Sequence, residues 1–241
     1  MSIYPYQKQS RSKSKAETLL KPDTPVKLTQ PFKGMLFTQE LSFIAMEMEQ
    51  AIFTISHGRL LVNPGDRIFL HSSSAAEVFT ARVIELDNYR GRLVLEDIKS
   101  LGRTWAKRSH DRVQPHQPTR VMLSCKDCFV PTFLENLSLA GVGLLIYKPV
   151  ERGLEPRIGH NVKVDFELPG VRGRLSLSGK LVNVSYPGER LAYVGIQIHP
   201  SAQQAYLMER YITDRKREII DEIDEVIHAS FVPPSVQDMY F

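Results

Sequence analysis

Two arginines, Arg108 and Arg112, lie four residues apart in a short polar segment of the sequence. The planar guanidinium of arginine forms paired hydrogen bonds with phosphate oxygens and with the O6 and N7 atoms of guanine. Two arginines on one flexible segment can therefore reach several acceptors of an anionic ligand. Arginines at this spacing also occur often as a solvated charge run, so the pair alone does not define a site.

A second polar motif follows, Asn136-Leu-Ser138-Leu-Ala-Gly141, and it continues into Val142-Gly143. Asn136 and Ser138 carry short hydrogen-bonding side chains at the end of a predicted strand. Gly141 and Gly143 allow the backbone to turn and to be approached closely. Asn-Leu-Ser is also a formal glycosylation sequon, so this motif is weak by itself.

The two motifs together are more specific than either alone. Asn136 follows Arg112 by 24 residues, and the motifs flank the first two strands of a predicted barrel. This arrangement resembles the PilZ family of cyclic di-GMP receptors over about residues 107–212. The N-terminal half also resembles the companion domain of the two-domain, flagellar-brake-like members. The resemblance implies a cyclic di-GMP site formed by Lys107, Arg108, Arg112, Asn136, Ser138, Gly141 and Gly143.

Cyclic di-GMP is a ring with two phosphodiesters and two guanines. The arginines suit its phosphates and guanines, and the short polar side chains of Asn136 and Ser138 suit a guanine edge. Some family members have a further arginine where this sequence has Lys107, and that arginine accompanies an intercalated ligand dimer. Lysine keeps the charge but cannot stack or bond as a planar fork, so the ligand stoichiometry stays open.

The sequence predicts a mainly β fold with two small β-barrel-like domains, the second a six-stranded antiparallel barrel followed by an α-helix. From Arg120 onward, six short runs of alternating apolar residues are separated by turn signals, which is typical of a closed barrel. A change of apolar phase near Leu181 indicates a β-bulge. The expected divisions are a disordered basic tail at 1–33, a β-rich domain with one helix at 34–104, a ligand-binding linker at 105–112, the PilZ barrel at 113–200, and the C-terminal helix and tail at 201–241.

Two helices are predicted from apolar spacing. Residues 41–55 follow the i, i+3, i+4, i+7 pattern of an amphipathic helix. Ser201 to about His228 form the second, with an apolar stripe that includes Ile212, Ile220 and Val226. We expect this helix to pack on its own chain, and a homodimer through 201–228 is the alternative. Strands are predicted in the N-terminal domain at Arg67–His71, Val78–Leu86 and Arg92–Ile98.

Charge and motifs exclude several function classes. The first 33 residues hold seven basic and two acidic side chains, a net charge of +5, so the rest of the chain contributes −1 to the formal total of +4. The barrel strands show no stripe of aromatic and basic residues, so we do not expect nucleic acid as a partner. A barrel that binds single-stranded nucleic acid and a ligand-free PilZ-fold interaction module remain the alternatives. The sequence contains none of the common nucleotide-binding, hydrolase or metalloprotease motifs, and we expect neither an enzyme nor a cofactor.

Cys125 and Cys128 form a C-x-x-C, but no second ligand pair accompanies them. We therefore expect a turn with reduced thiols and no metal site. No apolar run approaches the ~20 residues of a membrane helix, and residues 1–15 do not resemble a secretory signal. We expect a cytoplasmic receptor that acts on an unidentified protein target to regulate motility, exopolysaccharide or biofilm output. Ligand binding at the linker is expected to change the geometry between the two domains.

Overall fold

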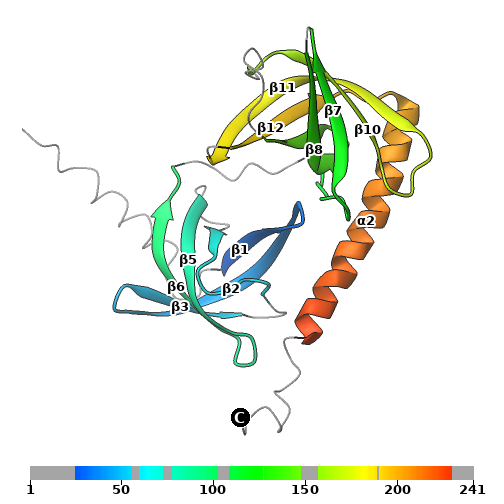
Figure 1. Cartoon of the computed structure of the whole chain (residues 1–241). Helices are drawn as coiled ribbons and strands as arrows, with labels where there is room; N and C mark the ends of the chain where they lie inside the picture. The colour runs from blue at the N-terminus through cyan, green and yellow to red at the C-terminus, as the bar shows by residue number, and fades with distance from the viewer. Residues whose placement is uncertain are drawn as a thin grey trace, which may run out of the picture. The chain divides into compact units, whose positions relative to one another are not determined.

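The computed structural model describes residues 25–55, 60–72, 78–102, 109–126, 128–147, 157–188 and 190–229. These residues fold into two compact units, and each unit contains a closed six-stranded antiparallel barrel (Figure 1). The second unit spans Arg108–Glu225 together with Lys33–Met35. The mainly β fold with two barrels, and a helix after the second one, confirms the predicted fold class.

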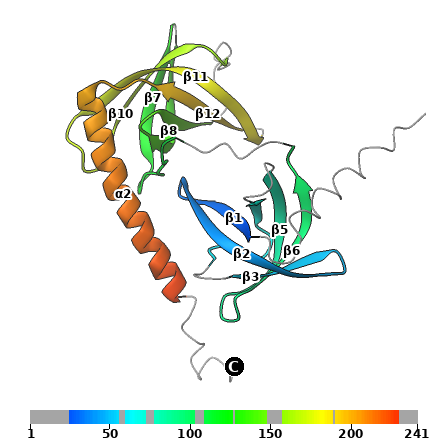
Figure 2. The same ribbon diagram turned by 180° about the vertical axis from the view of Figure 1, so that it is seen from behind.

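The first barrel has the strand order β1-β2-β3-β6-β5-β4. Figure 2 labels β1, β2, β3, β5 and β6 of this barrel. Its core is filled by inward-facing apolar residues, among them the fully buried Leu28, Phe53 and Leu95. The structure confirms the three strands predicted between residues 67 and 98. The strands are β1 (Pro25–Phe32), β2 (Met35–Glu47), β3 (Gln50–Ile55), β4 (Arg67–Ser72), β5 (Val78–Asp87) and β6 (Arg92–Ser100).

The helix predicted at 41–55 is wrong, because these residues form the β2–β3 hairpin. Ile44, Met46 and Met48 are 56%, 48% and 97% exposed, so the apolar residues of the segment do not share one buried face. Met48 and Glu49 have φ angles of 43° and 71° and turn the chain between the strands. The helical spacing arose because the exposed Ile44 of β2 and Met48 of the turn fall into one sequence pattern with buried residues of the two strands.

The disordered tail predicted over 1–33 is wrong for residues 25–32, which form β1. Val26 and Leu28 are fully buried, and Leu28 lies opposite Leu70 of β4. The strand contains only a few apolar residues, and its polar composition concealed the alternation. Residues 1–24 lie outside the described residues.

The second barrel has the order β10-β11-β12-β9-β8-β7, and pairing of β7 with β10 closes it. All six strands predicted for this barrel are confirmed. The register between β11 and β12 shifts between Leu181 and Asn183, which confirms the predicted bulge. The strands are β7 (Thr119–Cys125), β8 (Cys128–Ser138), β9 (Gly141–Tyr147), β10 (Asn161–Glu167), β11 (Arg174–Gly188) and β12 (Leu191–Ile198).

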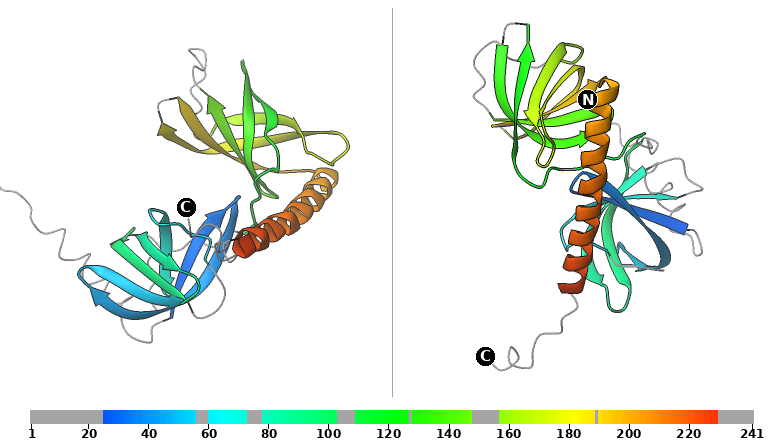
Figure 3. Two further views of the ribbon diagram at one scale, coloured as in Figure 1. Left: turned by 60° about the horizontal axis from the view of Figure 1, so that its bottom comes forward. Right: turned by 90° about the vertical axis from the view of Figure 1, so that its right-hand side faces the viewer.

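Helix α2 (Ala202–Ala229) follows β12 and begins beside the second barrel (Figure 3). Near its start, Nε2 of Gln204 donates to the carbonyl of Ser176 in β11 at 2.8 Å. Ile220 and Val226, expected in the buried stripe, are 45% and 48% exposed. No helix among the described residues is long and apolar enough to cross a membrane. The buried face of α2 consists of Met208, Tyr211, Ile212, Arg215, Ile219 and Ile223.

Candidate ligand-binding site on the second barrel

Asn136 and the largely buried Ser138 lie on the outer side of β8 because the strand contains a bulge at Glu135. Leu134 lies opposite Leu144 of β9 and Asn136 lies opposite Gly143, so the register skips Glu135. In a regular strand, residues three apart face opposite sides, yet Leu134 and Leu137 are both buried. The extra residue reverses the phase of the strand and turns Asn136 and Ser138 outward.

An isolated antiparallel bridge places Arg112 beside this second motif. The N–H of Val113 donates to the carbonyl of Leu137, and the N–H of Leu137 donates to the carbonyl of Val113, both at 2.9 Å. Val113 and Leu137 are fully buried. Because side chains alternate along an extended chain, the adjoining Arg112 and Ser138 face the opposite, outer side. The bridge therefore unites the described part of the arginine motif with the polar end of β8.

The side-chain amide of Asn136 is fixed by Tyr193 of β12. Its Nδ2 donates to the tyrosine hydroxyl at 3.0 Å. The two side chains meet over Gly143, where a Cβ would lie 2.5 Å from the hydroxyl of Tyr193 and 2.8 Å from Oδ1 of Asn136. Gly143 is therefore required for this contact. Tyr193 was missed by sequence reasoning, since only the pairing of β9 with both β8 and β12 brings it to Asn136.

Ser138 and Gly141 form the turn between β8 and β9. The hydroxyl of Ser138 donates to the carbonyl of Gly141 at 3.2 Å, and Ser138 is only 4% exposed. A Cβ on Gly141 would lie 3.2 Å from the carbonyl oxygen of Ile196. Both residues thus shape the turn, and the hydroxyl oxygen of Ser138 keeps its capacity to accept a hydrogen bond.

Aromatic side chains occupy the same outer face. Phe133 and Tyr147 form an edge-to-face pair with ring centroids 6.0 Å apart. Phe133, Leu145 and Tyr193 follow one another across β8, β9 and β12 in the register. Phe129 and Tyr147 are 75% and 62% exposed. This cluster of aromatic rings runs across neighbouring strands, so it cannot be recognised along any one of them in the sequence.

The structure brings most of the predicted site together. Lys107 and Arg108, which precede the bridge, lie outside the described residues, as does Trp105. The described residues of the predicted set share one region of the barrel surface: Arg112, Asn136, Ser138, Gly141 and Gly143.

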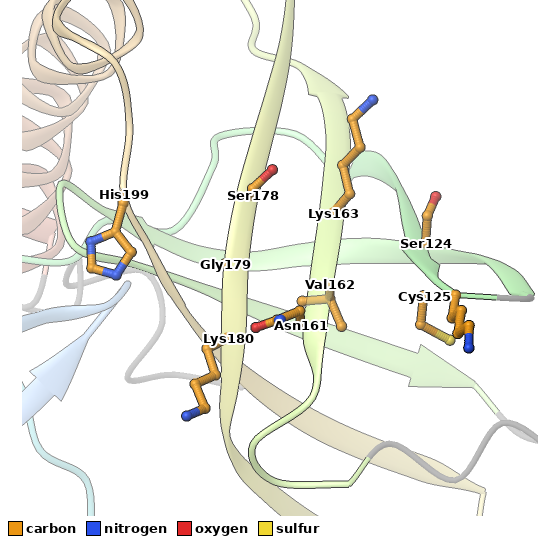
Figure 4. A pocket seen from close by; sticks show the side chains of 10 residues that line it. Ser124, Cys125, Asn161, Val162, Lys163, Ser178, Gly179, Lys180 and His199 are labelled. Atoms are coloured by element: carbon orange, nitrogen blue, oxygen red, sulfur yellow. The ribbon is translucent and has the colours of Figure 1, made fainter.

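A separate hollow of about 640 Å³ lies over β7, β10 and β11 (Figure 4). Three lysines, Lys126, Lys163 and Lys180, line it together with His199. Figure 4 shows the side chains of Lys163 and Lys180 extending in opposite directions. The cations therefore do not converge on one position, and we assign no ligand to this hollow.

Cys125 is disulfide-bonded, which differs from the expected pair of reduced thiols. The β7–β8 register places positions 125 and 128 directly opposite each other. Opposed positions of an antiparallel hairpin lie within the Cα separation that a disulfide requires. In the part of the chain that the structure describes, no three His, Cys, Asp or Glu residues are grouped to hold a metal ion.

Comparison with protein families identifies the second barrel. Residues 106–214 match the family model of the PilZ domain. The chain therefore carries a PilZ domain, and the resemblance drawn from the two motifs is confirmed. The match includes the arginine motif, the six strands of the second barrel and the first half of α2. No curated protein is significantly similar to the chain.

Several solved structures are similar to this chain at low sequence identity. The complex of MrkH with c-di-GMP from K. pneumonia is 13% identical, with 83% of this chain and 90% of that chain covered and a TM-score of 0.46. YcgR in complex with c-di-GMP from Escherichia coli is 14% identical, with 84% and 88% covered and a TM-score of 0.42. The inhibitor of motility MotI from Bacillus subtilis is 13% identical, with 82% and 98% covered and a TM-score of 0.40.

Proposed function

We propose that this protein is a receptor for cyclic di-GMP, which binds on the outer face of the PilZ barrel. The Val113–Leu137 bridge carries this proposal, because it brings Arg112 beside the polar end of β8. Arg112 supplies a planar fork for phosphate oxygens or for guanine O6 and N7. Asn136 and Ser138 supply an amide and a hydroxyl for a guanine edge. The match to the PilZ family supports the same ligand class.

In this proposal the ligand is bound and released unchanged, and the protein acts as a receptor in the cytoplasm. Lys107 and Arg108 complete the site from the segment that precedes Arg112. The bound ligand changes the geometry between the two units and so regulates motility, exopolysaccharide or biofilm output through a protein target. A homodimer through residues 201–228 is a further proposed interaction of α2.

Calorimetric titration with cyclic di-GMP tests the binding site. Arg112→Ala should weaken binding roughly 10- to 150-fold, because charge-assisted hydrogen bonds contribute ~1.5–3 kcal/mol each. Arg174→Ala is the matched control, since Arg174 is an exposed arginine at the start of β11. The control should bind like the wild type. Equal affinity of the wild type and Arg112→Ala would contradict the proposed site.

Single-stranded nucleic acid is a second candidate ligand, because the outer face also carries Phe129, Phe133 and Tyr147. Exposed aromatic rings of this kind can stack with bases. Titrations with cyclic di-AMP and with a short single-stranded oligonucleotide distinguish the candidates. The receptor proposal requires cyclic di-GMP to bind more tightly than both. Tighter binding of the oligonucleotide would favour the second candidate.

A further inference from the structure

Helix α2 holds the arginine segment, defined here as the described residues 109–118, through a buried arginine. Arg215 is 2% exposed. Its Nε donates to the carbonyl of Gln114 at 2.9 Å, and its Nη1 donates to Glu218 and Glu222 at 2.8 Å each. Gln114 directly follows the residue that bridges to β8. The contact therefore acts next to the point where the segment joins the barrel.

The two carboxylates explain how a guanidinium is tolerated in this position. A buried cation needs partners for its charge and for its N–H groups. Burial alone would lower the pKa of Arg215, but hydrogen bonds to Glu222 and Glu218 raise it overall, so the side chain stays charged. Both carboxylates belong to α2 itself and fix the plane of the guanidinium. Its Nε is thereby directed at Gln114, a geometry that the single ammonium of a lysine cannot reproduce.

The next residue of α2 contacts the arginine segment at a second point. Nζ of Lys216 donates to Oδ2 of Asp111 at 2.5 Å. Asp111 directly precedes Arg112, and a free carboxylate there would repel an anionic ligand and attract the arginine. The side chains of Lys216 and Asp111 are 35% and 62% exposed, so this ion pair contributes little to folding stability. Instead, the ion pair offsets the charge of Asp111 and fixes the position of the arginine segment.

We propose that Arg215 and Lys216 are positioning residues, through which α2 sets the place of the arginine segment and of Arg112 without touching the ligand. The identity of the ligand in this inference rests on the proposed function. The contacts that hold the arginine segment do not depend on it. Coupling between two sites is reciprocal, so a ligand on Arg112 would also stabilise α2 around these two residues.

Hydrogen exchange without ligand tests how the segment is held. In Arg215→Lys, the amides of Val113 and Leu137, which donate across the bridge, should exchange about tenfold faster, because the segment loses part of its anchor. Arg217→Ala is the control: Arg217 is 75% exposed and pairs with Asp214 within α2 at 3.8 Å. The control should leave both amides unchanged. Unchanged exchange in Arg215→Lys would overturn the inference for Arg215.

Calorimetry with cyclic di-GMP tests the consequence for binding. Arg215→Lys should bind about tenfold more weakly. Lys216→Ala should bind about threefold more weakly at low salt, with a smaller loss at high salt. Adding Asp111→Asn to Lys216→Ala should restore wild-type affinity, because the unpaired charge is gone. If affinity is not restored, Lys216 itself contacts the ligand and its positioning role is wrong.

The two measurements separate this inference from the proposed function. A wild type that does not bind cyclic di-GMP refutes the proposed function, while the exchange rates still decide whether α2 holds the segment. A wild type that binds, with Arg112→Ala weakened but Arg215→Lys unchanged in both exchange and affinity, refutes the positioning role alone. Unfolding midpoints of Lys216→Ala and the wild type should agree, because an exposed pair adds little stability.

Discussion

Asn136 is the residue whose orientation depends most on neighbours outside its own motif. The terminal torsion of an asparagine side chain is broad, so the amide needs a partner to select one orientation. Tyr193 supplies that partner, and Gly143 supplies the space in which the two side chains meet. At the residue scale, the hydroxyl of Tyr193 and the space left by Gly143 therefore preorganise the side-chain amide of Asn136.

Tyr193→Phe should weaken cyclic di-GMP binding by roughly fivefold. The substitution keeps the ring but removes the hydrogen bond that orients the amide, and one neutral hydrogen bond contributes about 1 kcal/mol. Tyr147→Phe is the matched control, since Tyr147 lies exposed on the same outer face. Calorimetry should give unchanged affinity for the control. If both variants bind like the wild type, Tyr193 does not prepare Asn136 for the ligand.

Gly143→Ala should weaken binding more than Gly141→Ala. A Cβ at position 143 would lie 2.5 Å and 2.8 Å from side-chain atoms that must then move apart. The nearest atom to a Cβ at position 141 is a backbone oxygen at 3.2 Å, a contact that needs only a small shift. Titration of both variants with cyclic di-GMP measures the difference. Circular dichroism should show that both keep the barrel, and a larger effect at position 141 would refute this account.

At the scale of elements, the second barrel could be predicted from sequence and part of the first could not. The strands of the second barrel bury alternate residues, so periodicity identifies them directly. In the β2–β3 hairpin, apolar residues such as Ile44 of β2 and Met48 of the turn face solvent and imitate a helix. Burial, and not propensity, decides which structure such a segment adopts.

The predicted site shows the same division between local and non-local information. The resemblance to the PilZ motifs proposed Arg112, Asn136 and Gly143 as site residues, because those residues belong to short continuous stretches. Tyr193 and Arg215 come from β12 and α2, and only the folded barrel and helix bring them to the motifs. The bulge at Glu135 was also missed. Leu134 and Leu137 could have indicated it, because two apolar residues three apart in one strand share a buried face only if the strand contains a bulge.

Helix α2 should make the stability of the protein sensitive to acid through Glu222. Burial acts to raise its pKa, but hydrogen bonds from Arg215 and Lys33 outweigh burial and lower the pKa from 4.5 to about 2. His116 also faces Glu222, with Nδ1 at 3.7 Å. A lowered native pKa stabilises the folded state above pH 4.5, and this contribution is lost as the pH falls toward 2.

Urea unfolding of the wild type and of Glu222→Gln tests this expectation. The wild type should be more stable than the variant above pH 4.5, and the difference in free energy of unfolding should shrink between pH 4.5 and 2. Glu209→Gln, which changes an exposed carboxylate of α2, should keep the pH dependence of the wild type. A constant difference between the wild type and Glu222→Gln across this range would show that Glu222 is not the group responsible.

At the scale of the whole molecule, the arginine motif belongs to the stretch that connects the two barrels in sequence. A ligand that bridges this stretch and β8 favours whichever arrangement lets both bind it, and so shifts the population toward that arrangement. We therefore expect cyclic di-GMP to change the radius of gyration measured by small-angle scattering, and the fluorescence of the single tryptophan, Trp105.

Arg112→Ala is the control for both signals, since it should show neither change at the same ligand concentration. Tight binding by the wild type with no change in scattering or fluorescence would refute the change of geometry. The proposed output would then depend on the surface that the ligand and the arginine segment form together.

The closure of both barrels restricts how another protein can bind them. Each sheet returns to its first strand, so neither barrel ends in an edge strand within the described residues. Unpaired backbone groups at a sheet edge are what a foreign strand requires for addition to a sheet. A protein target that binds the described residues is therefore expected to recognise side chains on the outer faces of the barrels or on α2. Substitutions on these surfaces can then change which protein is recognised, while the backbone pairing of both barrels stays intact.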